Sequence, residues 1–113
     1  MTILVTGGTG LVGTRLLPRL IDAGHTCRAL VRPGKALPAG ASAVAGDVLD
    51  STSLRPAVDG GTAIIHLAPL FRNATDEETR KVNLEGTRNL IAAAKPRAPQ
   101  ARFIMASHRA CLR

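Results

Sequence analysis

The sequence predicts a single α/β domain built on a parallel β-sheet with helices on both faces. Short apolar runs rich in β-branched residues alternate with segments of helical periodicity, and a glycine-rich turn separates the first run from the first such segment. The chain has 113 residues, enough for one hydrophobic core and too few for two. Because strands that alternate with helices are buried on both faces, we expect a doubly wound sheet.

The amino-terminal segment predicts a buried strand over residues 3–6, which ends at two glycines. A helix is expected over residues 11–23, and Gly24 should end it. Pro18 lies inside this helix and should kink it or remove one hydrogen bond. The helical spacing is carried by Val12, Leu16, Leu17, Leu20 and Ile21.

The middle of the chain predicts shorter elements. A second strand is expected at Thr26–Val31 and a third at Ser42–Ala45, with a loop that contains Arg32 and Lys35 between them. Ser51–Val58 can form only one or two helical turns, which a proline weakens. Residues 62–67 then predict a fourth buried strand.

The clearest helix is predicted over residues 75–95. Thr75 and Glu78 fit a capping box, and Lys95-Pro96 should end the helix. An apolar stripe recurs every four residues at Val82, Gly86, Leu90 and Ala94. Residues 102–107 predict a fifth strand, so the expected order of elements is β-α-β-β-α-β-α-β.

Composition narrows the classes of partner. The net charge of +7 suits an anionic partner, but the basic residues are spread along the chain and aromatic residues make up only 2%. We therefore expect a phosphorylated ligand and no nucleic acid. No apolar run approaches the roughly 18 residues of a membrane span, and no basic region precedes the first apolar run. Cys27 and Cys111 form no paired motif, so a cytoplasmic protein with reduced thiols and no membrane partner is expected.

The glycine-rich turn between the first strand and the first helix predicts a Rossmann-type dinucleotide site. Gly7 permits a tight turn, Gly10 lets the backbone approach a pyrophosphate, and Gly13 lets the helix pack closely. The free N–H groups at the start of the helix favour phosphate binding. A glycine turn without a ligand is the alternative.

The residues after the second strand favour NADP over NAD. NAD-binding proteins usually place an acidic residue about 20 residues beyond the glycines to hold the ribose. This chain has no acidic residue between Asp22 and Asp47, but it has Arg32 and Lys35. Cationic side chains there can bind a 2′-phosphate. The alternative for both is a solvated loop.

The ends of the third and fourth strands supply further candidates. Asp47 is expected to accept a hydrogen bond from adenine, although it could instead cap the following helix. Val48 could cover the adenine ring. His66 has no metal-ligand partner at useful spacing, so a core histidine is favoured over a catalyst.

Five motifs in order resemble the short-chain dehydrogenase/reductase superfamily, in its extended or atypical branch, often called NAD-dependent epimerase/dehydratase. They are Thr6-Gly-Gly-Thr-Gly-Leu-Val-Gly13, Ala29-Leu-Val-Arg32, Gly46-Asp-Val-Leu-Asp50, Ile64-Ile-His-Leu-Ala68 and Val82-Asn-Leu-Glu-Gly-Thr-Arg-Asn-Leu90. The resemblance implies strand order 3-2-1-4-5, a dinucleotide-binding domain over residues 1–107 that is truncated after the fifth strand, and an unassigned basic tail over residues 108–113.

The resemblance also implies which residues contact the dinucleotide. Those along the pyrophosphate would be Gly7, Thr9, Gly10, Leu11 and Val12. Those at the 2′-phosphate would be Arg32 and Lys35, and those at adenine would be Asp47 and Val48. Those near the ribose and nicotinamide would be Leu67, Ala68 and Pro69. Asn83 and Thr87 match positions where the family has polar residues that tie strands together.

The catalytic part of the resemblance is missing. The family uses a serine at the end of the fifth strand and a Tyr-x-x-x-Lys pair about 25 residues later for proton transfer. The chain contains no tyrosine, and His108 rather than Ser107 aligns with the catalytic serine. We therefore expect no catalytic residues, and the sequence suggests a truncated or frameshifted gene product.

The resulting prediction is the NADP-binding front half of an oxidoreductase or epimerase, without activity of its own. The alternative is a non-catalytic module that senses NADP and regulates a partner. Self-association is expected through the fifth strand, as an exposed edge, and through the apolar stripe of the long helix, part of which should lack cover.

Overall fold

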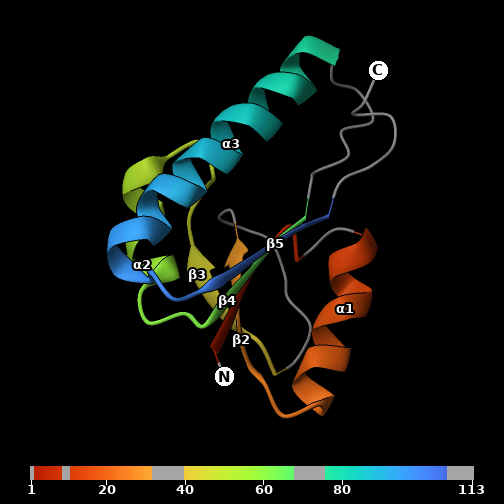
Figure 1. The fold of residues 1–113 in the computed structure, drawn as a ribbon. Helices are drawn as coiled ribbons and strands as arrows, with labels where there is room; N and C mark the ends of the chain where they lie inside the picture. Colours follow the sequence, from red (N-terminus) through yellow and green to blue (C-terminus); the bar gives the residue numbers. More distant parts are fainter. Residues whose placement is uncertain (1, 9–10, 32–39, 68–75, 107–113) are drawn as a thin grey trace.

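A computed structural model of the protein describes residues 2–8, 11–31, 40–67 and 76–106. It confirms a five-stranded parallel sheet with the order β3-β2-β1-β4-β5 (Figure 1). The strands are β1 (Thr2–Thr6), β2 (Thr26–Val31), β3 (Ser42–Ala45), β4 (Ala63–Leu67) and β5 (Arg102–Ala106). The order of elements along the chain is the predicted one.

Helices cover both faces of the sheet, with α1 (Leu11–Asp22) on one face and α2 (Ser51–Val58) and α3 (Asp76–Arg97) on the other (Figure 1). Alternate residues of a strand point to opposite faces, so Val5 packs with Leu17 of α1 in one core cluster. Leu4 packs with Leu54 of α2 and Leu90 of α3 in the other.

Burial of the strands differs from the prediction. β1 and β4 are buried on both faces, as expected for the centre of a doubly wound sheet. In β3 only Val44 is half-buried, and in β5 only Phe103 is, while the other residues of both strands are exposed. The reason is their place in the sheet, because each pairs with a single strand in the described part of the chain.

The long helix does not end at Lys95-Pro96 as predicted but continues to Arg97. Pro96 lies in the last turn, where it removes one backbone donor without breaking the helix. The turn is held by its surroundings: Ala94 and Ala98 are both buried, and the Ala98 N–H donates to the Ala94 carbonyl at 2.7 Å. Tertiary packing thus outweighs the local signal.

The apolar stripe of α3 is covered over its second half. Leu90 is completely buried and Ala94 is 8% exposed, because both pack in the cluster with α2 and the sheet, whereas Val82 is half-buried. The large exposed apolar side chains of α3 are instead Leu84 and Ile91, at 50% and 39% exposure. Any association through α3 would therefore use this second pair.

Two expectations from composition can be compared with the described residues. Cys27 is a free thiol in the core, 1% exposed, and burial raises its pKa above the ordinary value. A thiol in such surroundings has little thiolate character, and it is unpaired, as predicted; Cys111 lies outside the described residues. None of the helices in the described ranges is long and apolar enough to cross a bilayer.

Candidate functional site

The start of the glycine turn after β1 lies against the end of β4. Gly7 has a positive φ of 74°, a conformation that disfavours a side chain, and it is exposed. A Cβ at Gly7 would lie 2.9 Å from the Leu67 carbonyl oxygen and 3.0 Å from the Leu67 Cβ. Two residues predicted to line the site, from β1 and β4, are therefore adjacent.

The start of α1 packs against this turn. A Cβ at Gly13 would lie 2.4 Å from the Gly7 carbonyl oxygen, which confirms that this glycine is needed for close packing. Val12, predicted on the apolar face of the helix, is instead 58% exposed beside the turn. Thr9, Gly10 and the side chain of Leu11 lie outside the described residues.

Asp47 follows β3 and organises the turn before α2. Its Oδ1 accepts a hydrogen bond from the Leu49 N–H at 3.0 Å, and its own N–H donates to the Ser53 Oγ at 3.1 Å. The predicted alternative, a cap on α2, is not what the side chain does, because Asp50 is the N-cap residue and makes no side-chain capping bond. Asp47 as a residue is half-buried, just after the carboxyl end of β3.

Val48 is held by the long helix. The Asn89 Nδ2 donates to the Val48 carbonyl at 2.9 Å. A Cβ at Gly86 would lie 2.8 Å from the Val48 Cγ2, so the helix backbone approaches this segment closely. Asp47 and Val48 follow β3, whereas Gly7 follows β1, and β2 lies between these two strands in the sheet. The two segments therefore mark separate corners of the carboxyl edge of the sheet.

The basic residues expected at the 2′-phosphate, Arg32 and Lys35, lie outside the described residues, as do Ala68 and Pro69. A third basic residue near them in sequence, Arg28, has a different location. Its Nη1 donates to the carbonyl oxygens of Ala57 and Asp59, at 3.0 and 2.7 Å. Arg28 therefore caps the carboxyl end of α2, where a cation also complements the helix dipole.

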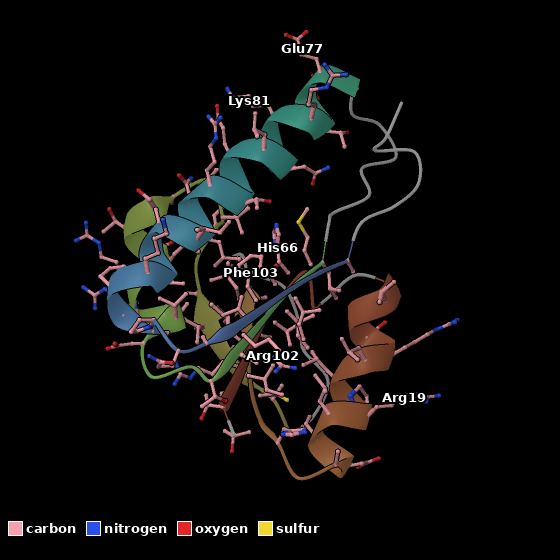
Figure 2. The ribbon with its side chains drawn as sticks, in the orientation of Figure 1. Arg19, His66, Glu77, Lys81, Arg102 and Phe103 are labelled. Carbon is pink, nitrogen blue, oxygen red and sulfur yellow. The ribbon has the colours of Figure 1, made fainter. Side chains whose placement is uncertain are left out.

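His66 links three elements beneath the site. It is 2% exposed in β4, and its Nδ1 lies 2.5 Å from the Oγ1 of Thr6, its register partner in β1. Its Nε2 lies 3.1 Å from the Thr87 Oγ1 on α3. The ring also packs at a tilt against Phe103 of β5, with centroids 6.3 Å apart, between the sheet and α3 (Figure 2).

Burial lowers the pKa of His66 below its ordinary value, so the imidazole is neutral near pH 7. This agrees with the prediction of a core histidine. Among the described residues, no group of histidine, cysteine, aspartate and glutamate side chains could hold a metal ion.

Sequence reasoning missed the partners that order these groups. Thr6, Ser53 and Asn89 were not singled out, yet each hydrogen-bonds to a residue that was. The signal for Thr87 was present in the family resemblance, which placed polar residues on the long helix. The hydrogen-bond partner of Thr87 could not be predicted, because the position of a residue in a helix does not specify which strand the residue faces.

Comparison with known proteins gives a consistent picture. The model of the NAD dependent epimerase/dehydratase family matches residues 3–110. A 3 beta-hydroxysteroid dehydrogenase/Delta 5-->4-isomerase of Mycobacterium tuberculosis is 37% identical over 115 residues, covering 93% of this chain. A short-chain dehydrogenase/reductase superfamily protein from Agrobacterium tumefaciens, solved with bound NAD, is 35% identical with a TM-score of 0.76 over 95% of this chain. A mutant uronate dehydrogenase from the same organism, complexed with NAD, is 27% identical with a TM-score of 0.77 over 94% of the chain.

The chain spans only part of these relatives: 31% of the mycobacterial protein and 32% and 40% of the two solved structures. The matched part carries the glycine turn and the parallel sheet described above. The family match reaches residue 110, three residues beyond the predicted limit at Ser107. Because the family model covers nearly the whole sequence, the chain belongs to the NAD dependent epimerase/dehydratase family, within the short-chain dehydrogenase/reductase superfamily.

Proposed function

We propose that the chain binds a nicotinamide dinucleotide across the carboxyl ends of β1, β3 and β4. The observation that carries this proposal is the approach of Gly7 to Leu67, followed by α1. A side chain at Gly7 would collide with the end of β4, and one at Gly13 would collide with the turn itself. Such a bare backbone at a helix start suits a pyrophosphate. Gly7, Thr9, Gly10, Leu11 and Val12 would hold it.

The remaining contacts follow from the family pattern. Asp47 and Val48 would hold the adenine at the end of β3, where both residues are half-buried and Oδ1 of Asp47 already accepts from the Leu49 N–H. Leu67, Ala68 and Pro69 would lie near the ribose and nicotinamide.

Within this function we propose a preference for NADP over NAD. Two of the solved relatives contain NAD, so the family as a whole does not favour this choice. The support is in this chain: Arg32 and Lys35 follow β2, and no carboxylate lies between Asp22 and Asp47 to repel a 2′-phosphate.

We further propose that these 113 residues do not catalyse hydride transfer. Proton transfer in this superfamily uses a tyrosine beside a lysine, and the chain has no tyrosine. The chain would then act as the dinucleotide-binding part of an oxidoreductase or epimerase. The alternative is a regulatory module that senses NADP, which would also lack the tyrosine. Both functions predict dinucleotide binding without hydride transfer.

We also propose that the protein is cytoplasmic and has no nucleic acid or membrane partner. A last part of the proposal is that the protein associates with itself. The support for self-association is the apolar surface around β5 and α3. Ile104 and Met105 are 45% and 47% exposed, in addition to Leu84 and Ile91. An apolar hollow between α3 and β5 also opens to the surface; its lining includes Ile91 and Phe103.

The central test is a titration of the chain with NADPH and NADH by calorimetry or fluorescence, followed by a hydride-transfer assay on a broad carbonyl panel. The Gly10→Val variant should lose binding. Gly24→Ala should retain it, because Gly24 is exposed with open space around it. No binding of either dinucleotide by the unaltered chain would contradict the proposal. Turnover that disappears in Gly10→Val would contradict the proposed inactivity.

A further inference from the structure

The hydrogen bonds around His66 fix the position of its proton. The Thr87 hydroxyl donates its only hydrogen to the Asn83 carbonyl at 2.6 Å, so towards His66 it can only accept. The proton of the neutral ring is therefore on Nε2. Nδ1 is then an acceptor, and the Thr6 hydroxyl donates to it. The result is a directed chain from Thr6 through His66 and Thr87 to the Asn83 carbonyl.

These consecutive hydrogen bonds lie directly behind the proposed dinucleotide site. Thr6 precedes Gly7, and His66 precedes Leu67, so the Thr6–His66 hydrogen bond and the Gly7–Leu67 contact are consecutive links between β1 and β4. His66 is 2% exposed and cannot reach a ligand outside. Any influence on binding must act through its neighbours.

Helix α3, whose Thr87 accepts the hydrogen bond from His66, also holds the Val48 segment at the other corner of the site. Thr87 is joined to the ends of β1 and β4 through His66, and two residues later Asn89 holds the Val48 carbonyl after β3. α3 therefore connects the glycine turn to the segment proposed to hold adenine. A shift of α3 relative to the sheet would therefore move the Val48 segment relative to the glycine turn.

We propose that His66 is a positioning residue for dinucleotide binding, which fixes α3 against β1 and β4 so that Val48 and Gly7 keep the spacing a dinucleotide requires. This inference rests on the proposed function. It assigns His66 a task beyond filling the core, for which an apolar residue would serve without the cost of burying polar atoms. A dinucleotide spans both corners, so a small shift of α3 affects its affinity more than it affects the fold.

Paired variants at position 87 provide the test. Thr87→Val is nearly isosteric but cannot accept from Nε2, so NADPH affinity should fall about fivefold, the value of one ordinary hydrogen bond. Thr87→Ser keeps the hydroxyl and should bind within about twofold of the unaltered chain. His66→Phe should weaken binding at least as much as Thr87→Val. Val58→Ala is the control: it creates a cavity in the core cluster formed by α2, α3 and the sheet, and should lower stability without changing NADPH affinity.

A spectroscopic readout accompanies these titrations. The ¹⁵N signals of His66 should show a neutral ring protonated on Nε2, and they should lose this pattern in Thr87→Val. A ring protonated on Nδ1 would overturn the proposal. Unchanged NADPH affinity in Thr87→Val would overturn it too, even if His66→Phe fails to fold, and would leave the proposed function intact. Failure of the unaltered chain to bind any dinucleotide would overturn the proposed function and this inference together.

Discussion

A side chain at Gly7 would collide with the backbone of Leu67, sixty residues further along the chain. The missing Cβ would lie 2.9 Å from the Leu67 carbonyl oxygen, which real Cβ atoms essentially never approach so closely. Gly7 also has a positive φ of 74°. The turn is thus constrained twice, by its own backbone conformation and by the neighbouring strand.

Gly7→Ala should therefore destabilise the protein by more than the backbone conformation alone explains. Adopting such a φ costs a non-glycine residue of order 1–3 kcal/mol, and displacing Leu67 adds to this. Gly24→Ala is the matched control, because Gly24 has φ +92° but nothing within 4 Å of its Cβ position. Urea unfolding should show a larger loss for Gly7→Ala. Equal losses would mean that the approach to Leu67 is relieved without cost.

Arg28 should contribute to stability and not to dinucleotide binding. Replacing it with methionine removes two hydrogen bonds to the carbonyl oxygens of Ala57 and Asp59, and we expect a loss of about 1–3 kcal/mol. Arg28→Lys should recover only part, because a lysine lacks the planar fork. Chemical denaturation measures the loss, with exposed Arg55→Met as the control. A large fall in NADPH affinity for Arg28→Met would assign Arg28 to the site instead.

The preference for NADP should depend on Arg32. Arg32→Asp places a negative charge after β2, where the 2′-phosphate is proposed to bind. NADPH affinity should fall about tenfold or more, since a charged hydrogen bond is worth about 1.5–3 kcal/mol. NADH affinity, measured in parallel by fluorescence, should change little. Tighter binding of NADH than of NADPH by the unaltered chain would contradict the preference.

Stability should fall in mild acid because of His66. Burial lowers its pKa in the folded protein, whereas in the unfolded chain the group returns to about 6.5. Below that pH the unfolded chain binds a proton that the folded protein does not, so the free energy of unfolding decreases as the pH falls towards the folded pKa. Urea unfolding between about pH 5 and 8 should show a slope of up to about 1.4 kcal/mol per pH unit. His66→Phe should flatten this slope and Val58→Ala should keep it.

The sequence predicted the positions of the strands well because hydrophobic period and glycine chemistry are local signals. The turn at Gly7, the packing of Gly13 and the bounds of the five strands follow from them, whereas the order of the strands in the sheet came from the family resemblance. The end of α3 was misjudged because Ala94 and Ala98 are held by tertiary packing, which a local proline rule does not include.

The site was predicted less completely. Gly7, Leu67, Asp47 and Val48 do lie at the carboxyl edge of the sheet, but several of the hydrogen bonds around them come from residues distant in sequence. The link from Thr6 to His66 spans 60 positions and that from Asn89 to Val48 spans 41. No periodicity encodes such pairs, because they depend on how α3 packs over the sheet.

Self-association should depend on β5 and be weakened by a single charge. β5 is at the edge of the described sheet, and Ile104 is 45% exposed. Ile104→Lys should reduce association, since a charge on an edge strand opposes pairing with another chain. Ala43→Lys, at an exposed position in β3 on the opposite edge, is the control and should have no effect. Size exclusion with light scattering measures the association of both variants. The measurement is repeated with NADPH at 100 times its Kd, because the bound ligand would add about 2.7 kcal/mol to the stability of the folded protein and so limit any association that proceeds through unfolding. A monodisperse monomer without cofactor would show that neither β5 nor the exposed side chains of α3 form an interface.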